Sequence, residues 1–251
     1  VFELTDLCGH GHTAGLEQVA AAQDRHLACD LGSRAVTRGR RRDARDQCDA
    51  PRDQLAGALG LQLLERHRLL WLYLKRYSDF FTHPGELLHI APEQCFYHRF
   101  KALPHLKVLT GDIESPLADL HFDLHHIPLE ANRFDVVLCN HVLEHVADDA
   151  QCLSELFRVM KPGGWGIFQI PWIPGRTATD EDPSITDPRE RERRFGQYDH
   201  VRMYGEDYAQ RLSAAGFNVE RVDLADRIPA DEYARYRLPV GEPLFVVRKP
   251  L

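Results

Sequence analysis

Short apolar segments alternate with helix-length segments over residues 86–247, and this alternation constrains the fold more than any other feature. Five patterns typical of buried strands lie at residues 86–90, 106–109, 120–124, 134–139 and 165–170, with two more at 217–222 and 244–247. Helical patterns with one apolar face lie at residues 96–103, 148–160 and 205–215. Strands joined by helices form parallel sheets that are covered on both faces. The sequence therefore predicts a doubly wound, mostly parallel, seven-stranded α/β sheet.

The first 53 residues differ from the rest in composition. The segment from Arg34 to Arg52 holds seven arginines, whereas all five lysines of the chain lie beyond residue 74. A segment without an apolar face cannot bury enough surface to fold by itself. We predict a poorly structured leader over residues 1–53 and hypothesise that it is out of frame or misassembled. Residues 54–251 then form one domain, with a long helix over 54–81 and a charged, proline-rich insertion at about 173–199.

The charge balance and the cysteines limit the possible partners. The chain has 31 basic and 38 acidic residues, a net charge of −7, which argues against a nucleic-acid or anionic-membrane partner. No apolar run approaches the roughly 20 residues of a membrane span, and no secretion signal opens the chain. The six cysteines include no C-x-x-C pair. We therefore predict reduced thiols and a cytoplasmic location, while the sequence carries no signal for an oligomeric state.

A long run around the fourth predicted strand resembles a known family. Residues 134–146 read FDVVLCNHVLEHV and residues 155–164 read ELFRVMKPGG. Together they resemble the class I S-adenosylmethionine-dependent methyltransferases, as do DHVRMY at 199–204 and AGF at 215–217. More narrowly, LLHIAPEQCFYHRF at 87–100 looks like an uncharacterised bacterial branch of that family. The resemblance implies a Rossmann-like methyltransferase fold, an enzyme, and S-adenosylmethionine as its cofactor.

The first strand of this family usually opens a glycine-rich turn, which lets the backbone approach the cofactor closely. Here the turn is His89-Ile90-Ala91-Pro92-Glu93-Gln94 and has no glycine. The resemblance suggests that Glu93 meets the ammonium group of the cofactor, and the alternative is a solvated loop carboxylate. His89 is interpreted as a histidine packed at the strand end.

Two acidic residues follow the next strands. Asp112 ends the second strand, where a carboxylate can accept hydrogen bonds from both ribose hydroxyls. Its alternative role is to form a turn. Asp123 resembles the family's acidic residue near the adenine, with a turn again as the alternative. Only eight residues separate Asp112 from His121, which predicts a trimmed second helix.

Asn140 and His141 end the fourth strand, where the family places cofactor and substrate contacts. If the following segment is helical, His141, Glu144 and His145 share a face on which a divalent ion could bind. Quinone-pathway O-methyltransferases resemble this pattern with a glutamate in place of His141. The alternative is that His145 packs beneath the sheet and Glu144 caps a helix. We adopt the alternative and predict no metal site.

His200 and His141 are the candidate catalytic bases, because neutral imidazole accepts protons near neutral pH. His200 follows the insertion, which could cover the site, and the alternative is that Arg202 and Asp199 pair to hold the insertion down. The resemblance implies methyl transfer to an O or N nucleophile of a small molecule. A non-catalytic binding module on the same fold is the main alternative. An RNA methyltransferase would require the arginine-rich segment to be an ordered arm.

Overall fold

The computed structural model describes residues 64–251. The predicted leader and the first part of the helix predicted over 54–81 lie outside the described residues. Within the described residues the helix is α2 (Glu65–Arg76), which ends five residues before the predicted end at Phe81. It buries Leu69, Leu70 and Trp71, as its apolar pattern requires.

A seven-stranded sheet forms the centre of the domain, with the strand order β3-β2-β1-β4-β5-β9-β8. The strands are β1 (Gly85–Ile90), β2 (Leu106–Asp112), β3 (Leu120–His121), β4 (Phe134–Asn140), β5 (Met160–Gln169), β8 (Asn218–Val222) and β9 (Leu244–Arg248). All neighbours pair in parallel except β9, which runs antiparallel to both β5 and β8. The predicted mostly parallel, seven-stranded sheet is thus confirmed.

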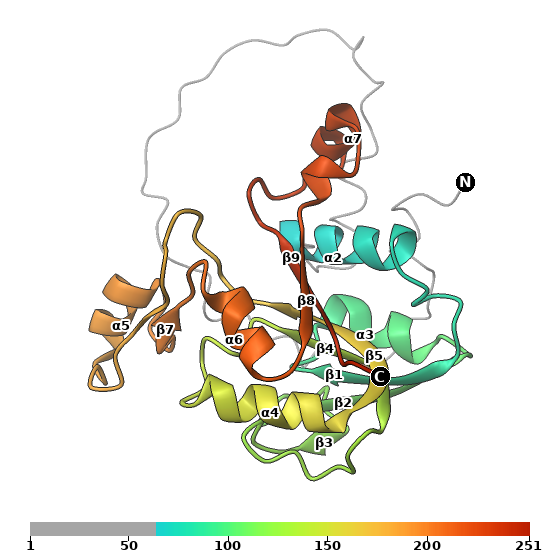
Figure 1. Cartoon of the computed structure of the whole chain (residues 1–251), viewed down its shortest axis with the longest axis horizontal. Coiled ribbons are helices and arrows are strands. Elements are labelled where there is room, and N and C mark those ends of the chain that lie inside the picture. Colours follow the sequence, from blue (N-terminus) through green and yellow to red (C-terminus); the bar gives the residue numbers. More distant parts are fainter. Residues whose placement is uncertain (1–63) are drawn as a thin grey trace, which may run out of the picture. The chain divides into compact units, whose positions relative to one another are not determined.

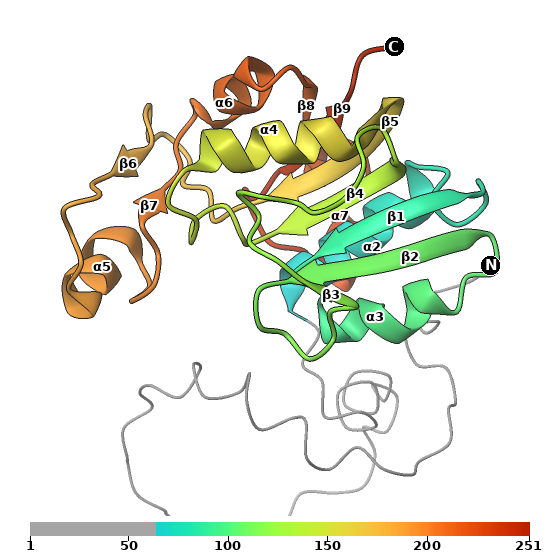
Figure 2. The same cartoon turned by 90° about the horizontal axis from the view of Figure 1, so that it is seen from below.

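Helices cover both faces of this sheet (Figures 1 and 2). The helices α2 and α3 (Gln94–Lys101) lie on one face, and α4 (Asp149–Val159) and α6 (Tyr208–Ala214) lie on the other. Val137 from β4, Leu156 from α4 and Phe168 from β5 are fully buried in the core between the sheet and the second helix pair. Strands β1 and β4 are buried over most of their length because both of their faces are covered.

Two predicted strand boundaries are wrong. We expected Lys161 to Gly164 to separate the preceding helix from a strand starting at Trp165, but β5 already begins at Met160. Phe134 pairs with Met160 and Val136 with Trp165, so the proline and glycines are accommodated as an irregularity in the ladder. The third strand is only two residues long, because residues 122–124 leave the sheet. The trimmed helix predicted between β2 and β3 is wrong, because bends and turns alone make this connection.

The insertion has its own small structure. It contains β6 (Asp180–Glu181) and α5 (Pro188–Phe195), and β6 pairs antiparallel with β7 (Arg202–Met203). The helix α5 begins with Pro188 after Asp187, whose side chain accepts hydrogen bonds from the amides of Arg189 and Glu190. The short helices η3 (Leu224–Asp226) and α7 (Ala230–Arg235) lie between β8 and β9 and were not predicted.

Within residues 64–251, no helix is both long and apolar enough to cross a membrane. Cys95, Cys139 and Cys152 form no disulfide. Burial raises the pKa of Cys95 and of Cys152 to about 12, so these thiols stay protonated and unreactive at neutral pH.

Candidate active site

The carboxyl ends of β1 and β4 lie side by side at the point where the strand order reverses. Ile90 of β1 pairs with Cys139 of β4, and the residues that follow each strand turn away from the sheet. Ala91 has φ +47° and His141 has φ +54°, a left-handed conformation that residues other than glycine rarely adopt. In doubly wound sheets, ligands bind beyond the carboxyl ends of the strands at this reversal. Two strained turns at the same edge therefore mark it as the candidate site.

Glu93 turns inward at this edge and does not project into solvent. Its side chain is 16% exposed, and its Oε2 bonds with Nε2 of the fully buried His89. Its Oε1 accepts a hydrogen bond of 3.2 Å from Nδ2 of Asn140. Burial works to raise the pKa of Glu93, but the adjacent His89 outweighs it and holds the pKa below its usual range. Glu93 is thus a buried, ionised group that ties the ends of β1 and β4 together.

Buried polar atoms without a protein partner gather around this pair of strand ends. Among the described residues, six buried side-chain nitrogen or oxygen atoms have no hydrogen-bond partner. Apart from the indole nitrogen of Trp71, they belong to His67, His89, Asn140, His141 and Glu144. A buried, unpaired polar group costs about 1–3 kcal/mol, so folded proteins usually provide a partner for it. Their concentration at one edge of the sheet indicates a place where a polar ligand binds.

Asp112 and Asp123 each use one carboxylate oxygen in a turn. Oδ1 of Asp112 accepts hydrogen bonds of 2.8 Å from the amides of Glu114 and Ser115. Oδ1 of Asp123 accepts from the amide of His125 at 2.9 Å and from Nδ1 of the same residue at 2.6 Å. Both carboxylates lie at strand ends of the same edge as His141. The turns orient these side chains. The contacts of Asp112 with the ribose and of Asp123 with the adenine stay predictions.

His141 lies against a buried carboxylate in the turn after β4. Its Nδ1 is 3.4 Å from Oε1 of Glu144, whose side chain is only 2% exposed. His145 lies on the other side of Glu144, with Nε2 at 4.0 Å from the same oxygen and Nδ1 at 3.4 Å from Oδ2 of Asp199. The expected alternative roles of these residues are wrong. Residues 143–145 form a turn, and the cap of α4 is Asp148 instead of Glu144.

His200 packs beside His145, with ring centroids 4.8 Å apart. It is 6% exposed, and its Nδ1 bonds with the carbonyl of Phe195 at 3.0 Å. Since a carbonyl only accepts, Nδ1 carries the proton and Nε2 keeps its lone pair. Burial lowers the pKa of His200, so the ring is neutral at pH 7.

Arg202 holds the insertion against the turn after β4. Its guanidinium is 3% exposed and donates to the carbonyls of Leu143, Val146 and Ala147 at 2.7, 2.5 and 2.9 Å. Its Nε donates to Oε2 of Glu181 at 3.0 Å. The alternative pairing of Arg202 with Asp199 is therefore wrong, because Asp199 faces His145 and Arg202 donates to backbone carbonyls.

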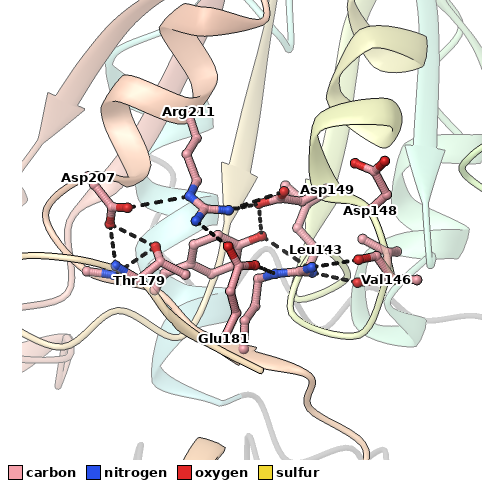
Figure 3. Close-up of polar contacts among 12 residues, drawn as sticks. Leu143, Val146, Asp148, Asp149, Thr179, Glu181, Asp207 and Arg211 are labelled. Atoms are coloured by element: carbon pink, nitrogen blue, oxygen red, sulfur yellow. Dashed lines mark hydrogen bonds and ion pairs between the residues drawn. The ribbon is translucent and has the colours of Figure 1, made fainter. Parts of the chain in front are cut away.

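A second arginine extends this network to the helices. Figure 3 shows Arg211 of α6 between three carboxylates. Its guanidinium donates to Asp149 at 3.0 Å and to Glu181 at 2.6 Å, and it lies 3.5 Å from Asp207. Glu181 thus joins both arginines. The network fixes where the insertion, and with it His200, lies against the end of β4.

Comparisons with known proteins agree with this architecture. Residues 88–168 match the family model of a methyltransferase domain. Over 66 residues the chain is 41% identical to a probable S-adenosylmethionine-dependent methyltransferase of Mycolicibacterium smegmatis, covering 24% of this chain and 26% of that protein. Over 66 residues it is 50% identical to an uncharacterised 37.1 kDa protein in transposon Tn4556 of Streptomyces fradiae, covering 26% and 16%. The chain carries a class I S-adenosylmethionine-dependent methyltransferase domain.

The chain spans about a quarter or less of the length of these curated relatives. Among solved structures, the (4+2)-cyclase SpnF matches with a TM-score of 0.51 at 17% identity, covering 73% of this chain and 81% of that chain. At that identity the match shows the fold alone. The methyltransferase fold predicted from the sequence is confirmed.

The methyltransferase domain meets the chemical needs of its family's cofactor, S-adenosylmethionine. The unpaired oxygen Asn140 Oδ1 is an acceptor suited to a positively charged amine. Asp112 stands at the end of β2, where a ribose would need a carboxylate. Ala91 reaches the left-handed turn conformation without a glycine. The residues present therefore fit this group, although the turn contains no glycine.

The structure brings together Glu93, Asn140, His141 and His200 around the end of β4, whereas Asp112 and Asp123 follow neighbouring strands.

Sequence reasoning missed two residues near this site, His67 and Glu242. His67 lies on α2, is 9% exposed, and interacts electrostatically with Glu93. Burial raises the pKa of Glu242, and His141 partly offsets this effect. His67 lies within the helix predicted over residues 54–81, whereas nothing in the sequence marks Glu242.

His67 is expected to make the domain lose stability in mild acid. Burial lowers its pKa from 6.5 to about 4, so the unfolded chain takes up the proton first as the pH falls. The contribution of neutral His67 to the free energy of unfolding is complete above pH 6.5 and is lost as the pH falls to 4. The loss has reached about 2 kcal/mol at pH 5. His67→Phe, which keeps a ring beside Phe96, should remove this part of the pH dependence.

Urea unfolding of wild type and His67→Phe at pH 7 and pH 5 measures the effect. Carboxylates titrate in both proteins and cancel in the difference between them. Equal losses of unfolding free energy in the two proteins would show that His67 does not cause the acid sensitivity.

Proposed function

We propose that this chain transfers a methyl group from S-adenosylmethionine to an oxygen or nitrogen nucleophile of a small molecule. Bound S-adenosylmethionine supplies a methyl group that its sulfonium already activates. The protein therefore has to hold the two reactants in line and accept a proton from the nucleophile.

The cluster of unpaired buried polar atoms at the ends of β1 and β4 carries this proposal. Asn140 offers an oxygen toward a positively charged amine, and Glu93 adds negative charge behind it. Asp112 accepts from the ribose and Asp123 lies toward the adenine. The mild net negative charge of the chain suits a small acceptor better than a nucleic acid.

His141 and His200 are the proposed proton acceptors. His141 is the more accessible of the two, with a side chain that is 23% exposed, and Glu144 stabilises the imidazolium that forms on protonation. His200 is more deeply buried and is fixed by the carbonyl of Phe195. These positions favour His141 as the group that takes the proton, with His200 behind it.

A binding module without catalysis is the second candidate function. The observation that favours it is the glycine-free turn, in which Glu93 occupies the space between His89 and Asn140. The solved structure named a (4+2)-cyclase has a similar fold, so the fold alone does not assign methyl transfer. Turnover separates the candidates, because an enzyme releases S-adenosylhomocysteine with a suitable acceptor and a module does not.

Calorimetry with S-adenosylmethionine tests the cofactor site. We expect micromolar binding by wild type and a 10- to 100-fold loss of affinity, on the order of 1.5–3 kcal/mol, in Asp112→Asn. The asparagine keeps an oxygen that accepts from Glu114 and Ser115, so it preserves the turn and removes only the charged partner of the ribose.

The matched control is Asp79→Asn, an exposed carboxylate near the opposite edge of the sheet, which should bind like wild type. An Asp112→Asn protein with wild-type affinity would limit Asp112 to forming the turn. Absence of binding by pure, folded wild type would reject the methyltransferase proposal in favour of the module.

A further inference from the structure

Three side chains from two distant segments converge next to the proposed methyl-transfer site. Glu144 and His145 follow β4, and His200 follows the insertion. Each offers one potential metal ligand, and these three atoms all lie within 4.8 Å of one another. This trio differs from the one considered in the sequence, because His200 takes part and His141 does not.

Both imidazoles are oriented by an oxygen on the far side of the ring. Nδ1 of His145 faces Asp199 at 3.4 Å, and Nδ1 of His200 bonds with the carbonyl of Phe195 at 3.0 Å. An acceptor at Nδ1 fixes the proton there and leaves Nε2 free to bind a metal. Metal-binding histidines almost always have such a partner.

Glu144, the third member of the trio, is a buried carboxylate with one oxygen that has no hydrogen-bond partner. Glu144 is 1% exposed, and its Oε2 has no hydrogen-bond partner. Its neighbours His141 and His145 lie at 3.4 and 4.0 Å from the other oxygen. Burying a carboxylate is costly unless a cation or several donors compensate it. The unpaired oxygen is therefore an observation, independent of the histidines, that indicates a bound cation.

We propose that Glu144, His145 and His200 bind one divalent transition-metal cation of the Zn²⁺ type. Two imidazoles and one carboxylate suit Zn²⁺ or Co²⁺, whereas Mg²⁺ and Ca²⁺ prefer oxygen ligands. Ligand bonds of about 2.0–2.1 Å would draw the three atoms closer together than they now lie, which small side-chain rotations achieve. A metal on Nε2 of His200 leaves His141 as the proton acceptor. The proposal does not depend on methyl transfer.

Metal binding to the full chain tests the site directly. Protein stripped with a chelator and dialysed is titrated with Zn²⁺, and the bound metal is counted by mass spectrometry. Cysteines and histidines elsewhere in the chain can also bind Zn²⁺, so the difference between proteins is the measured quantity. Wild type should bind one equivalent more than Glu144→Gln and than His200→Ala, and excess Mg²⁺ should not displace it.

Co²⁺ gives a second readout, since a four- or five-coordinate site absorbs visible light far more strongly than six-coordinate aqueous Co²⁺. We expect this absorption in wild type and in His83→Ala, a control at an exposed histidine before β1, and its loss in Glu144→Gln. His145→Asn is the second variant if His200→Ala does not fold. Equal metal content and equal spectra in wild type and the folded variants would overturn the proposal. Loss of the metal in His145→Asn with unchanged S-adenosylmethionine binding would confirm the metal site separately from the proposed function, because His145 has no part in the proposed cofactor site.

Discussion

Arg202→Met is expected to lower the free energy of unfolding by about 3–5 kcal/mol, one of the two largest effects that we predict. The buried guanidinium satisfies three carbonyls of the turn after β4 and one oxygen of Glu181. Methionine fills much of the same volume, so the lower free energy of unfolding comes from carbonyls left without a donor and not from a cavity. Urea unfolding at pH 7 measures it.

Two further variants sharpen this test. Arg202→Lys keeps the charge but cannot donate in a fixed fork, so it should remain destabilised. Arg193→Met is the matched control in the same insertion, because Arg193 is 76% exposed and pairs only at the surface with Glu190. It should change stability by less than about 1 kcal/mol. An Arg202→Met protein as stable as this control would show that the carbonyl contacts contribute little.

His141→Asn is expected to reduce methyl transfer by about 10²- to 10⁴-fold, the usual contribution of a general base. Asparagine tolerates the left-handed backbone at this position, so the turn after β4 should persist. The measurement is release of S-adenosylhomocysteine with the best acceptor from a panel of small hydroxyl and amine compounds. Binding of S-adenosylmethionine should change by only a few fold.

The separation between turnover and binding is the decisive part of this experiment. His98→Ala, an exposed histidine on α3, serves as the control and should retain full activity. Wild-type turnover in His141→Asn would remove His141 as the base. Equal losses of turnover and of cofactor affinity would instead assign it to cofactor binding.

The order and type of the elements were largely predictable because they follow from local patterns. The run FDVVLC became β4, and the amphipathic pattern over 148–160 became α4 with Asp148 as its cap. The start of β5 was not predictable, because proline and glycine ordinarily end a strand. Here pairing of Met160 with Phe134 outweighs that local preference.

For the site, local patterns along the chain are enough to say which residues stand at the strand ends. A parallel sheet brings the carboxyl ends of its strands to one edge, so Glu93, Asp112 and Asn140 had to lie there. Only the tertiary structure decided which of them face one another: Glu93 turns inward to His89, and His200 approaches Glu144 across more than fifty residues of chain. The physical reason is that such contacts depend on long-range packing, here on a buried arginine that binds carbonyls, and a backbone carbonyl leaves no trace in the sequence.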